Sequence, residues 1–305
     1  MMKNGTVWQD TDGNAIQAHG GSMLFHEGVY FWYGESYEWY RGLCINDGFR
    51  CYSSTDLVNW KNEGKILDVF KERHWANHDL YYTSVLQRPS VVYNDKTKKF
   101  VLYFHCDDPA YIKACVGVGV SDTPTGLFNY IGSFQPHYRP IHDMTLFKDT
   151  DGFAYLVTAS DHNRSLRSIM LDEDYMTCWN YTIVCPEIAN VATREAPVLL
   201  KKDDTYYLFS SGCSGWAPNA ALCMKTDDIR GEWETLGNPC IGDNADKTFY
   251  GQSAFAFEHN GDWYFAADRW NPKDLTQSGY IWLKIDFTGG NPVLRWKDEF
   301  NPTEK

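Results

Sequence analysis

The sequence contains no uninterrupted apolar run of about 18 residues, the length that a membrane-spanning helix needs. Its first residues, Met1 to Gly5, form no apolar segment of the kind found in secretory signals. We therefore expect a cytoplasmic protein, or a secreted or periplasmic one if an export signal was removed. Basic residues are also scarce, since 28 Lys and Arg stand against 40 Asp and Glu, a net charge of −12. Nucleic acids and anionic membranes attract basic surfaces, so we expect neither as a partner.

Metal-binding cysteine motifs are missing as well. The nine cysteines are irregularly spaced and form no CxxC pair, which argues against a zinc ribbon or a thioredoxin-like site. We expect mostly buried thiols in a reducing compartment, with a few disulfides as the alternative. His74 and His78 have HxxxH spacing, but no Glu follows His74 as a zinc-protease motif requires. The sequence therefore predicts no metal site from these motifs.

Long helical periodicity is absent, which disfavours alternating α/β folds. Aromatic residues are abundant instead, at 16% of the chain with 12 Trp and 20 Tyr. Such residues favour β-strands, and they also form surfaces on which sugar rings stack.

One unit recurs along the chain: a polar residue, a short apolar strand, a Gly, Asn or Asp turn, and an aromatic-rich strand. Two such strands around a tight turn indicate a β-hairpin, and further strand-like segments follow several of the hairpins. The five units cover residues 19–35, 87–105, 143–157, 195–210 and 252–267. Their first residues are 68, 56, 52 and 57 positions apart, which is room for about four strands each. The sequence therefore predicts an all-β fold, a single five-bladed β-propeller over residues 1–305.

The polar residues that begin the units are candidates for a common site. In a propeller the first strand of each blade lines the central channel, so its first residue faces one mouth of that channel. These five residues, which we call the blade heads, are His19, Gln87, Asp143, Glu195 and Gln252. A ring of carboxylates, amides and an imidazole at one opening predicts a pocket that carries chemistry. The alternative is that these residues only solvate an open channel or cap turns.

Two carboxyl groups in an aromatic-rich pocket suit the hydrolysis of glycosidic bonds, in which one of them protonates the leaving oxygen. Burial or a second negative charge raises the pKa of that acid, so that it still holds a proton near neutral pH. Asp143 and Glu195 are the carboxylates among the blade heads.

Longer motifs carry a resemblance to a known family. Asp143-Met-Thr-Leu-Phe-Lys-Asp-Thr-Asp-Gly and Arg194-Glu195-Ala-Pro resemble glycoside hydrolase family 43, five-bladed propeller enzymes that act with inversion. The segment from Asn14 to Gly21, with Trp32-Tyr-Gly-Glu35, is more similar still to the exo-β-1,3-galactanase branch. The resemblance covers nearly the whole chain. It implies that Glu195 is the general acid and that Asp143 tunes the pKa of Glu195 and orients it.

The chain departs from the family pattern at two blade heads. The family's base is usually an aspartate at the first head, where this chain has His19. The galactanase branch shows the same gap and has a glutamine at the fifth head, which matches Gln252 and implies that this amide positions the water. Inversion would then need roughly 6.5–9.5 Å between Glu195 and Gln252. The second departure is Gln87, where the branch commonly has glutamate. Gln87 keeps a hydrogen-bond acceptor but loses a charge.

Five further residues are candidates for sugar contacts. Glu35 ends an aromatic strand and could contact sugar hydroxyls from the pocket wall. Alternatively, it forms a salt bridge at the surface or between blades. Tyr111 matches a tyrosine that contacts the sugar in the galactanase branch, and Asn163 matches an amide that the branch uses near the acid. Trp216 lies in a Gly- and Pro-containing loop and would stack on a galactose ring, or else pack between blades. His19 is expected to bind substrate, or to hold water or a structural calcium ion in the channel.

These residues together predict an exo-acting glycosidase that releases terminal galactose from β-1,3-galactan-type chains, with an oligo- or polysaccharide as the partner. Within the same family, α-L-arabinofuranosidase, β-xylosidase and β-galactofuranosidase activities remain alternatives, because loops set the substrate. A carbohydrate-binding propeller without catalysis is the alternative from another class.

Overall fold

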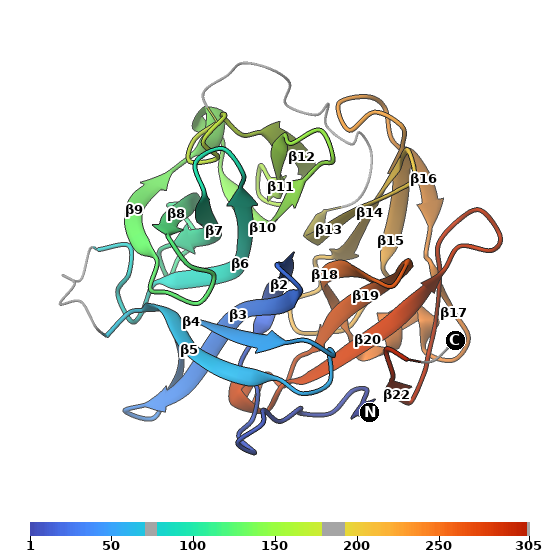
Figure 1. Ribbon diagram of the computed structural model, residues 1–305, viewed down its shortest axis with the longest axis horizontal. Helices are drawn as coiled ribbons and strands as arrows, with labels where there is room; N and C mark the ends of the chain where they lie inside the picture. Colours follow the sequence, from blue (N-terminus) through green and yellow to red (C-terminus); the bar gives the residue numbers. More distant parts are fainter. Residues whose placement is uncertain (71–77, 179–192, 304–305) are drawn as a thin grey trace.

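The computed structural model describes residues 1–70, 78–178 and 193–303. Five β-sheets stand around a common centre, which confirms the five-bladed β-propeller (Figure 1). The first blade contains β2 (His19–His26), β3 (Val29–Tyr40), β4 (Leu43–Ser54) and β5 (Lys61–Asp68). The second contains β6 (Val85–Asn94), β7 (Lys99–Asp107), β8 (Cys115–Ser121) and β9 (Asn129–Phe134). The third contains β10 (Ile141–Lys148), β11 (Ala154–Ser160) and β12 (Ser165–Met170).

The fourth and fifth blades complete the ring. The fourth contains β13 (Arg194–Lys202), β14 (Thr205–Gly212), β15 (Leu222–Thr226) and β16 (Glu234–Gly237). The fifth contains β18 (Gln252–His259), β19 (Asp262–Arg269), β20 (Gly279–Asp286), β21 (Val293–Arg295) and β17 (Cys240–Ile241). The short 3₁₀ helices η1 (Pro136–Tyr138), η2 (Ala245–Tyr250) and η3 (Leu275–Gln277) lie in connections between strands.

Tight turns explain two of the hairpins. The turn between β2 and β3 has Glu27 at φ 49° and Gly28 at φ 83°. The turn between β18 and β19 has Asn260 at φ 53° and Gly261 at φ 83°. Two consecutive residues with positive φ form the type of two-residue turn whose twist matches that of paired strands, and Asn-Gly is its favoured sequence.

The innermost strand of each blade is the one that begins near a predicted blade head. Strands β2, β6, β10, β13 and β18 contact one another in turn, and β18 contacts β2 to close the ring. The heads therefore lie at the centre of the molecule, as the repeat predicts.

The N-terminal segment is attached to the last blade. Strand β1 (Met2–Lys3) pairs with β22 (Glu299–Phe300), so the first and last strands of the described chain lie side by side. The Gly5 N–H donates to the Tyr280 carbonyl at 2.7 Å, and the Tyr280 N–H donates to the Thr6 carbonyl at 3.1 Å. Backbone hydrogen bonds thus attach the N-terminal segment both to β22 and to β20 of the last blade.

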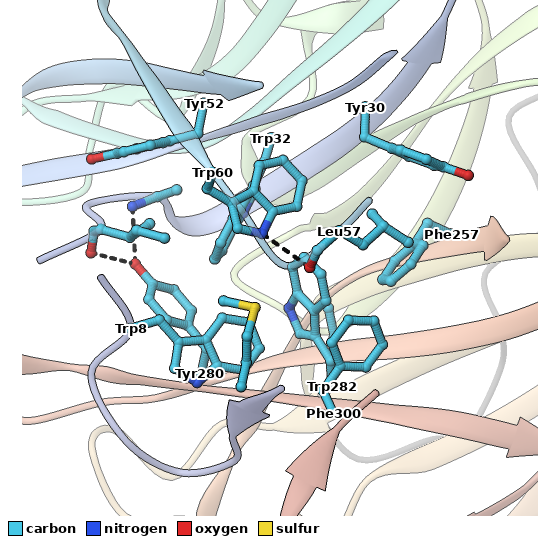
Figure 2. Close-up of a cluster of buried hydrophobic side chains, with 14 of the residues drawn as sticks. Trp8, Tyr30, Trp32, Tyr52, Leu57, Trp60, Phe257, Tyr280, Trp282 and Phe300 are labelled. Carbon is cyan, nitrogen blue, oxygen red and sulfur yellow. Dashed lines mark hydrogen bonds between the residues drawn. The ribbon is translucent and has the colours of Figure 1, made fainter. Parts of the chain in front are cut away.

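Much of the aromatic surplus is used for packing between the first and last blades. Figure 2 shows Trp8, Trp32, Trp60, Tyr280 and Trp282 in one buried cluster. The ring centres of Trp32 and Tyr280 are 4.7 Å apart, and those of Trp8 and Trp282 are 5.1 Å apart, both edge to face. Each such pair contributes about 0.5–1.5 kcal/mol beyond the burial of its area. These rings stabilise the closure of the propeller rather than contact a sugar.

The described cysteines form no disulfide, and most are buried. The buried thiols belong to Cys51, Cys106, Cys115, Cys178, Cys223 and Cys240, whereas Cys44 is half-buried and Cys213 is exposed. Buried free thiols are as predicted; Cys185 and His74 lie outside the described residues. The part of the chain that the structure describes contains no helix long and apolar enough to span a membrane.

Candidate active site

Each inner strand begins with an irregularity in its pairing. The register shifts lie between His19 and Ser22, Gln87 and Ser90, Ile141 and Met144, Glu195 and Val198, and Ser253 and Phe255. A β-bulge breaks the alternation of a strand and redirects a side chain. The bulges therefore decide which way the blade heads face.

In three blades the residue after the head has a left-handed backbone. Gly20, Arg88 and Ala196 have φ values of 53°, 56° and 52°. For arginine and alanine this conformation costs about 1–2 kcal/mol. Hydrogen bonds hold both residues in place, since the Arg88 N–H donates to Glu35 Oε1 at 2.9 Å and the Ala196 N–H donates to Asp143 Oδ2 at 3.0 Å. The strained positions thus link neighbouring blades, the second to the first and the fourth to the third.

A pocket of about 320 Å³ opens where the heads converge, and residues from all five blades line it. It brings together eight of the predicted site residues: Glu35, Gln87, Tyr111, Asp143, Asn163, Glu195, Trp216 and Gln252. Other lining side chains were not predicted as site residues: Tyr37, Arg88, His105, His142 and Trp270.

Arg88 is the charged centre of the pocket floor. Its guanidinium forms an ion pair with Asp143 at 2.9 Å and donates to Gln252 Oε1 at 2.8 Å and to the Ser253 carbonyl at 3.0 Å. Burial lowers the pKa of Arg88, but the negative charges of Asp143 and Glu35 outweigh burial and raise it above its usual value. The cation is therefore permanent. In the sequence, Arg88 could have been found as part of the Arg-Pro pair that directly follows the second blade head.

Glu195 has the properties of a proton donor at neutral pH. Burial, with the negative charge of Asp143 as the second cause, raises the pKa of Glu195 to about 7, although Arg88 acts in the opposite direction. Glu195 Oε1 accepts a hydrogen bond from Gln252 Nε2 at 2.9 Å. The carboxyl is thus both partly protonated at neutral pH and fixed in orientation.

The predicted mechanism required a gap of roughly 6.5–9.5 Å between Glu195 and Gln252. The structure has no such gap. The two side chains are in direct contact, so no water fits between them. The amide oxygen of Gln252 accepts from Arg88 and, at 2.9 Å, from Trp270 Nε1. Its nitrogen donates to Glu195 and, at 3.1 Å, to Ser211 Oγ. An amide has two donor hydrogens and two acceptor lone pairs, and all four are used. In this arrangement the Gln252 side chain has no donor or acceptor left for a water molecule.

Glu35 lies deep in the pocket wall, with only 1% of its surface exposed. Burial raises the pKa of Glu35 to about 7, even though Arg88 and a hydrogen bond from the Tyr37 hydroxyl lower it. The carboxylate passes close to the first blade head, because a Cβ atom at Gly20 would lie 2.2 Å from Glu35 Oε1. A glycine is therefore required at that position.

His19 does not face the opening, which corrects the prediction of five heads around one mouth. Its side chain is fully buried and stacks on the ring of Tyr280, with centroids 4.9 Å apart and planes inclined by 9°. Its Nδ1 lies 3.4 Å from Asp268 Oδ1, and its Nε2 lies 3.4 Å from the Tyr280 hydroxyl. Both ring nitrogens thus face protein groups, and His19 is a buried packing residue that does not line the pocket.

Aromatic side chains form part of the pocket wall. Trp216 is 56% exposed and packs edge to face against Trp270, with ring centres 5.8 Å apart. Tyr111 is also exposed, and it lines the pocket beside Gln87. Exposed rings with one free face are suited to stacking on the apolar face of a sugar.

Asn163 offers an unused acceptor to the pocket. Its backbone has φ 62°, and its buried side-chain Oδ1 has no hydrogen-bond partner among the residues that the structure describes. A buried acceptor normally has a partner, so a hydroxyl of a ligand in the pocket is a suitable donor.

The fold and this pocket, with two carboxyls of raised pKa beside a third at the mouth of a propeller channel, define the class of glycoside hydrolases. Residues 17–281 match the model of glycosyl hydrolases family 43, and the chain belongs to this family.

Solved structures of this family are similar over nearly the whole chain. A GH43 β-1,3-galactosidase with galactodeoxynojirimycin is 37% identical, with a TM-score of 0.89 and coverage of 98% of this chain and 100% of that one. An exo-β-1,3-galactanase from Phanerochaete chrysosporium with β-1,3-galactotriose is 33% identical, with a TM-score of 0.88 and coverage of 97% and 67%. An exo-β-1,3-galactanase from Clostridium thermocellum is 33% identical, with a TM-score of 0.85 and coverage of 97% and 65%.

A curated relative is more distant. A xylan 1,3-β-xylosidase from Vibrio sp. is 23% identical over 251 residues, which cover 76% of this chain. The match spans 44% of the length of that relative.

Proposed function

We propose that this protein removes terminal β-1,3-linked galactose from galactan-type chains, with Glu195 as the general acid. The observation that carries this proposal is the Glu195 carboxyl, whose pKa of about 7 leaves it partly protonated in a pocket beside the charged Asp143–Arg88 pair. An acid in this state can protonate the leaving oxygen of a glycosidic bond.

The choice of sugar is supported by similarity. Relatives at 37% and 33% identity are a β-1,3-galactosidase with galactodeoxynojirimycin and an exo-β-1,3-galactanase with β-1,3-galactotriose. The shape of the site supports action on chain ends, because residues from all five blades enclose one pocket at the channel mouth. In this proposal Trp216 stacks on the sugar, and Gln87, Tyr111, Asn163 and Glu35 contact its hydroxyls.

The roles of the remaining groups follow from their bonds. Asp143 accepts hydrogen bonds from Arg88 and from the Ala196 N–H. Its negative charge raises the pKa of Glu195 and so favours the protonated form of that carboxyl. Gln252 holds the Glu195 carboxyl in one orientation. We expect the reaction to proceed with inversion, as the family resemblance implies.

The test is incubation with β-1,3-galactooligosaccharides and a panel of aryl glycosides that includes arabinofuranosides, xylosides and galactofuranosides. We expect galactose as the released sugar, with its α-anomer appearing first by NMR. Glu195→Gln should lower kcat by about 10²- to 10⁴-fold, whereas Glu234→Gln, an exposed carboxylate of the same blade, should not. Activity should fall as pH rises past about 7, because Glu195 then loses its proton.

Each proposed role has an outcome that contradicts it. Release of another sugar in preference would reject the substrate, and early β-galactose would reject inversion. Full activity of Glu195→Gln would reject the acid. Binding of galactooligosaccharides without any turnover would indicate a carbohydrate-binding propeller instead.

A further inference from the structure

Three side chains of the kinds that bind transition metals meet on the wall between the second and third blades. His105 and Asp107 come from the end of β7, and His142 comes from the start of β10. One ligand atom of each lies within 4.8 Å of the other two. The two histidines also line the pocket of the candidate active site. None of the roles proposed above uses them.

Burial and bonding make this cluster more than a chance grouping. His105, Asp107 and His142 are only 1%, 2% and 9% exposed. His142 Nε2 has no hydrogen-bond partner in the part of the chain that the structure describes. Leaving a buried polar atom without a partner costs about 1–3 kcal/mol, and a bound ligand would remove that cost.

The geometry is close to that of a metal site. His105 Nε2 and Asp107 Oδ2 are 3.0 Å apart, a spacing that two ligands of one ion can have. A metal with bonds of about 2.0–2.2 Å keeps its ligand atoms about 3–4 Å apart. The ligand atom of His142 lies within 4.8 Å of the other two, so it must move closer to them to share one ion.

The donor set indicates which ion. Calcium and magnesium prefer oxygen ligands, whereas two imidazoles with one carboxylate suit Zn²⁺, Ni²⁺ or Co²⁺. We propose that His105, Asp107 and His142 bind one such divalent transition-metal ion on the pocket wall. Three protein ligands leave a tetrahedral ion one free position. Since both histidines line the pocket, a water or a sugar hydroxyl in the pocket can occupy it.

The experiment uses the full protein, stripped with EDTA and titrated with Co²⁺ by absorption spectroscopy and with Zn²⁺ by calorimetry. We expect one ion per chain. His142→Gln and Asp107→Asn should each weaken binding by about tenfold or more, since even indirect partners of metal ligands contribute that much. His162→Gln is the matched control and should bind normally, because this exposed histidine neighbours His142 but is not one of the three.

A second readout separates binding from folding. Zn²⁺ should raise the unfolding temperature of the parent and of His162→Gln, but not that of His142→Gln or Asp107→Asn. If one variant has no unfolding transition, the other decides. The proposal is overturned by absence of binding in the parent, by undiminished binding in both site variants, or by a thiolate–Co²⁺ charge-transfer band, which would place the ion on a cysteine. Ca²⁺ and Mg²⁺ should not compete, and effective competition would overturn the assignment of the ion.

Discussion

The two ends of the inner strands differ although they belong to the same five strands. At their starts the strands are bulged and surround a pocket of about 320 Å³ lined by charged, amide and aromatic side chains. Further along, the pairing is regular, and a cavity of about 580 Å³ is lined by apolar residues such as Leu24, Val91 and Phe257 together with polar ones such as Lys148 and Glu258 at its edge. The comparison shows that one ring of strands supports two environments, and that the bulges mark the boundary between them.

The difference has an electrostatic side. At the pocket end Arg88, Asp143 and Glu35 are withdrawn from water and act on one another, and burial raises the pKa values of Glu35 and Glu195 to about 7. At the other end the ion pair of Lys148 with Asp95 involves an Asp95 side chain that is 70% exposed. Charged side chains are therefore costly to bury at the pocket end, whereas water screens them at the other end.

The strongest test of this contrast removes the central cation. Arg88→Met leaves Asp143 without its ion-pair partner and Gln252 without one of its donors, so the free energy of unfolding should fall by about 3–5 kcal/mol. Activity should fall as well, because Gln252 then holds Glu195 less firmly. Denaturant unfolding and initial rates measure both. Lys148→Met at the other end is the control, and a loss above about 1 kcal/mol there would contradict the contrast.

A core substitution at the apolar end should change stability alone. Phe257 is 5% exposed and packs against Trp282 with ring centres 4.9 Å apart. Phe257→Ala should lower the free energy of unfolding by about 3–5 kcal/mol and leave kcat per folded molecule unchanged. Phe25→Ala, at an exposed ring of the same cavity, should cost far less. A changed kcat in Phe257→Ala would show that the two ends are coupled.

The third prediction concerns the pH dependence of stability. Glu35 has a folded-state pKa of about 7 against a reference of 4.5, so the native state binds its proton more tightly than the unfolded state. Its contribution to stability is complete below about pH 4.5 and is lost as pH rises through 7, by on the order of 3 kcal/mol. Glu35→Gln should flatten this decline in denaturant unfolding at pH 5 and 8, whereas the exposed Glu27→Gln should not. An unchanged decline in Glu35→Gln would mean that Glu35 keeps an ordinary pKa.

The smallest effect is expected at the pocket wall. Trp216→Ala removes an exposed ring, so KM for galactooligosaccharides should rise by a factor that corresponds to about 1 kcal/mol, with kcat nearly unchanged. Trp39→Ala, an equally exposed tryptophan that does not line the pocket, is the control. Equal KM values for the parent and Trp216→Ala would show that this ring does not contact the sugar.

Much of the fold could be predicted because its signals are local. Each hairpin is encoded in about 20 consecutive residues, with alternating strands and turn residues such as Asn260-Gly261. The five units then required a ring, since each sheet buries its faces against its neighbours. The same repeat led to Glu195, Asp143 and Gln252 as members of one pocket.

The roles within the pocket could not be read in the same way. His19 occupies a head position like the others, yet its ring lies against Tyr280, 261 positions away. Gln252 was expected to face a water, but its amide is occupied by partners from the second, fourth and fifth blades. A one-residue bulge decides which face a side chain takes, and no alternation pattern reveals it.

The sequence by itself determined the number of blades, the order of the strands and the carboxylates and amides that begin them, because these depend on turns and periodicity along the chain. Only the tertiary structure decided that Arg88 is the centre of the floor, that Glu195 has a raised pKa and that Gln252 contacts it directly. These properties arise from burial and from hydrogen bonds between blades. They exist only when residues far apart in the chain are brought within about 3 Å of one another.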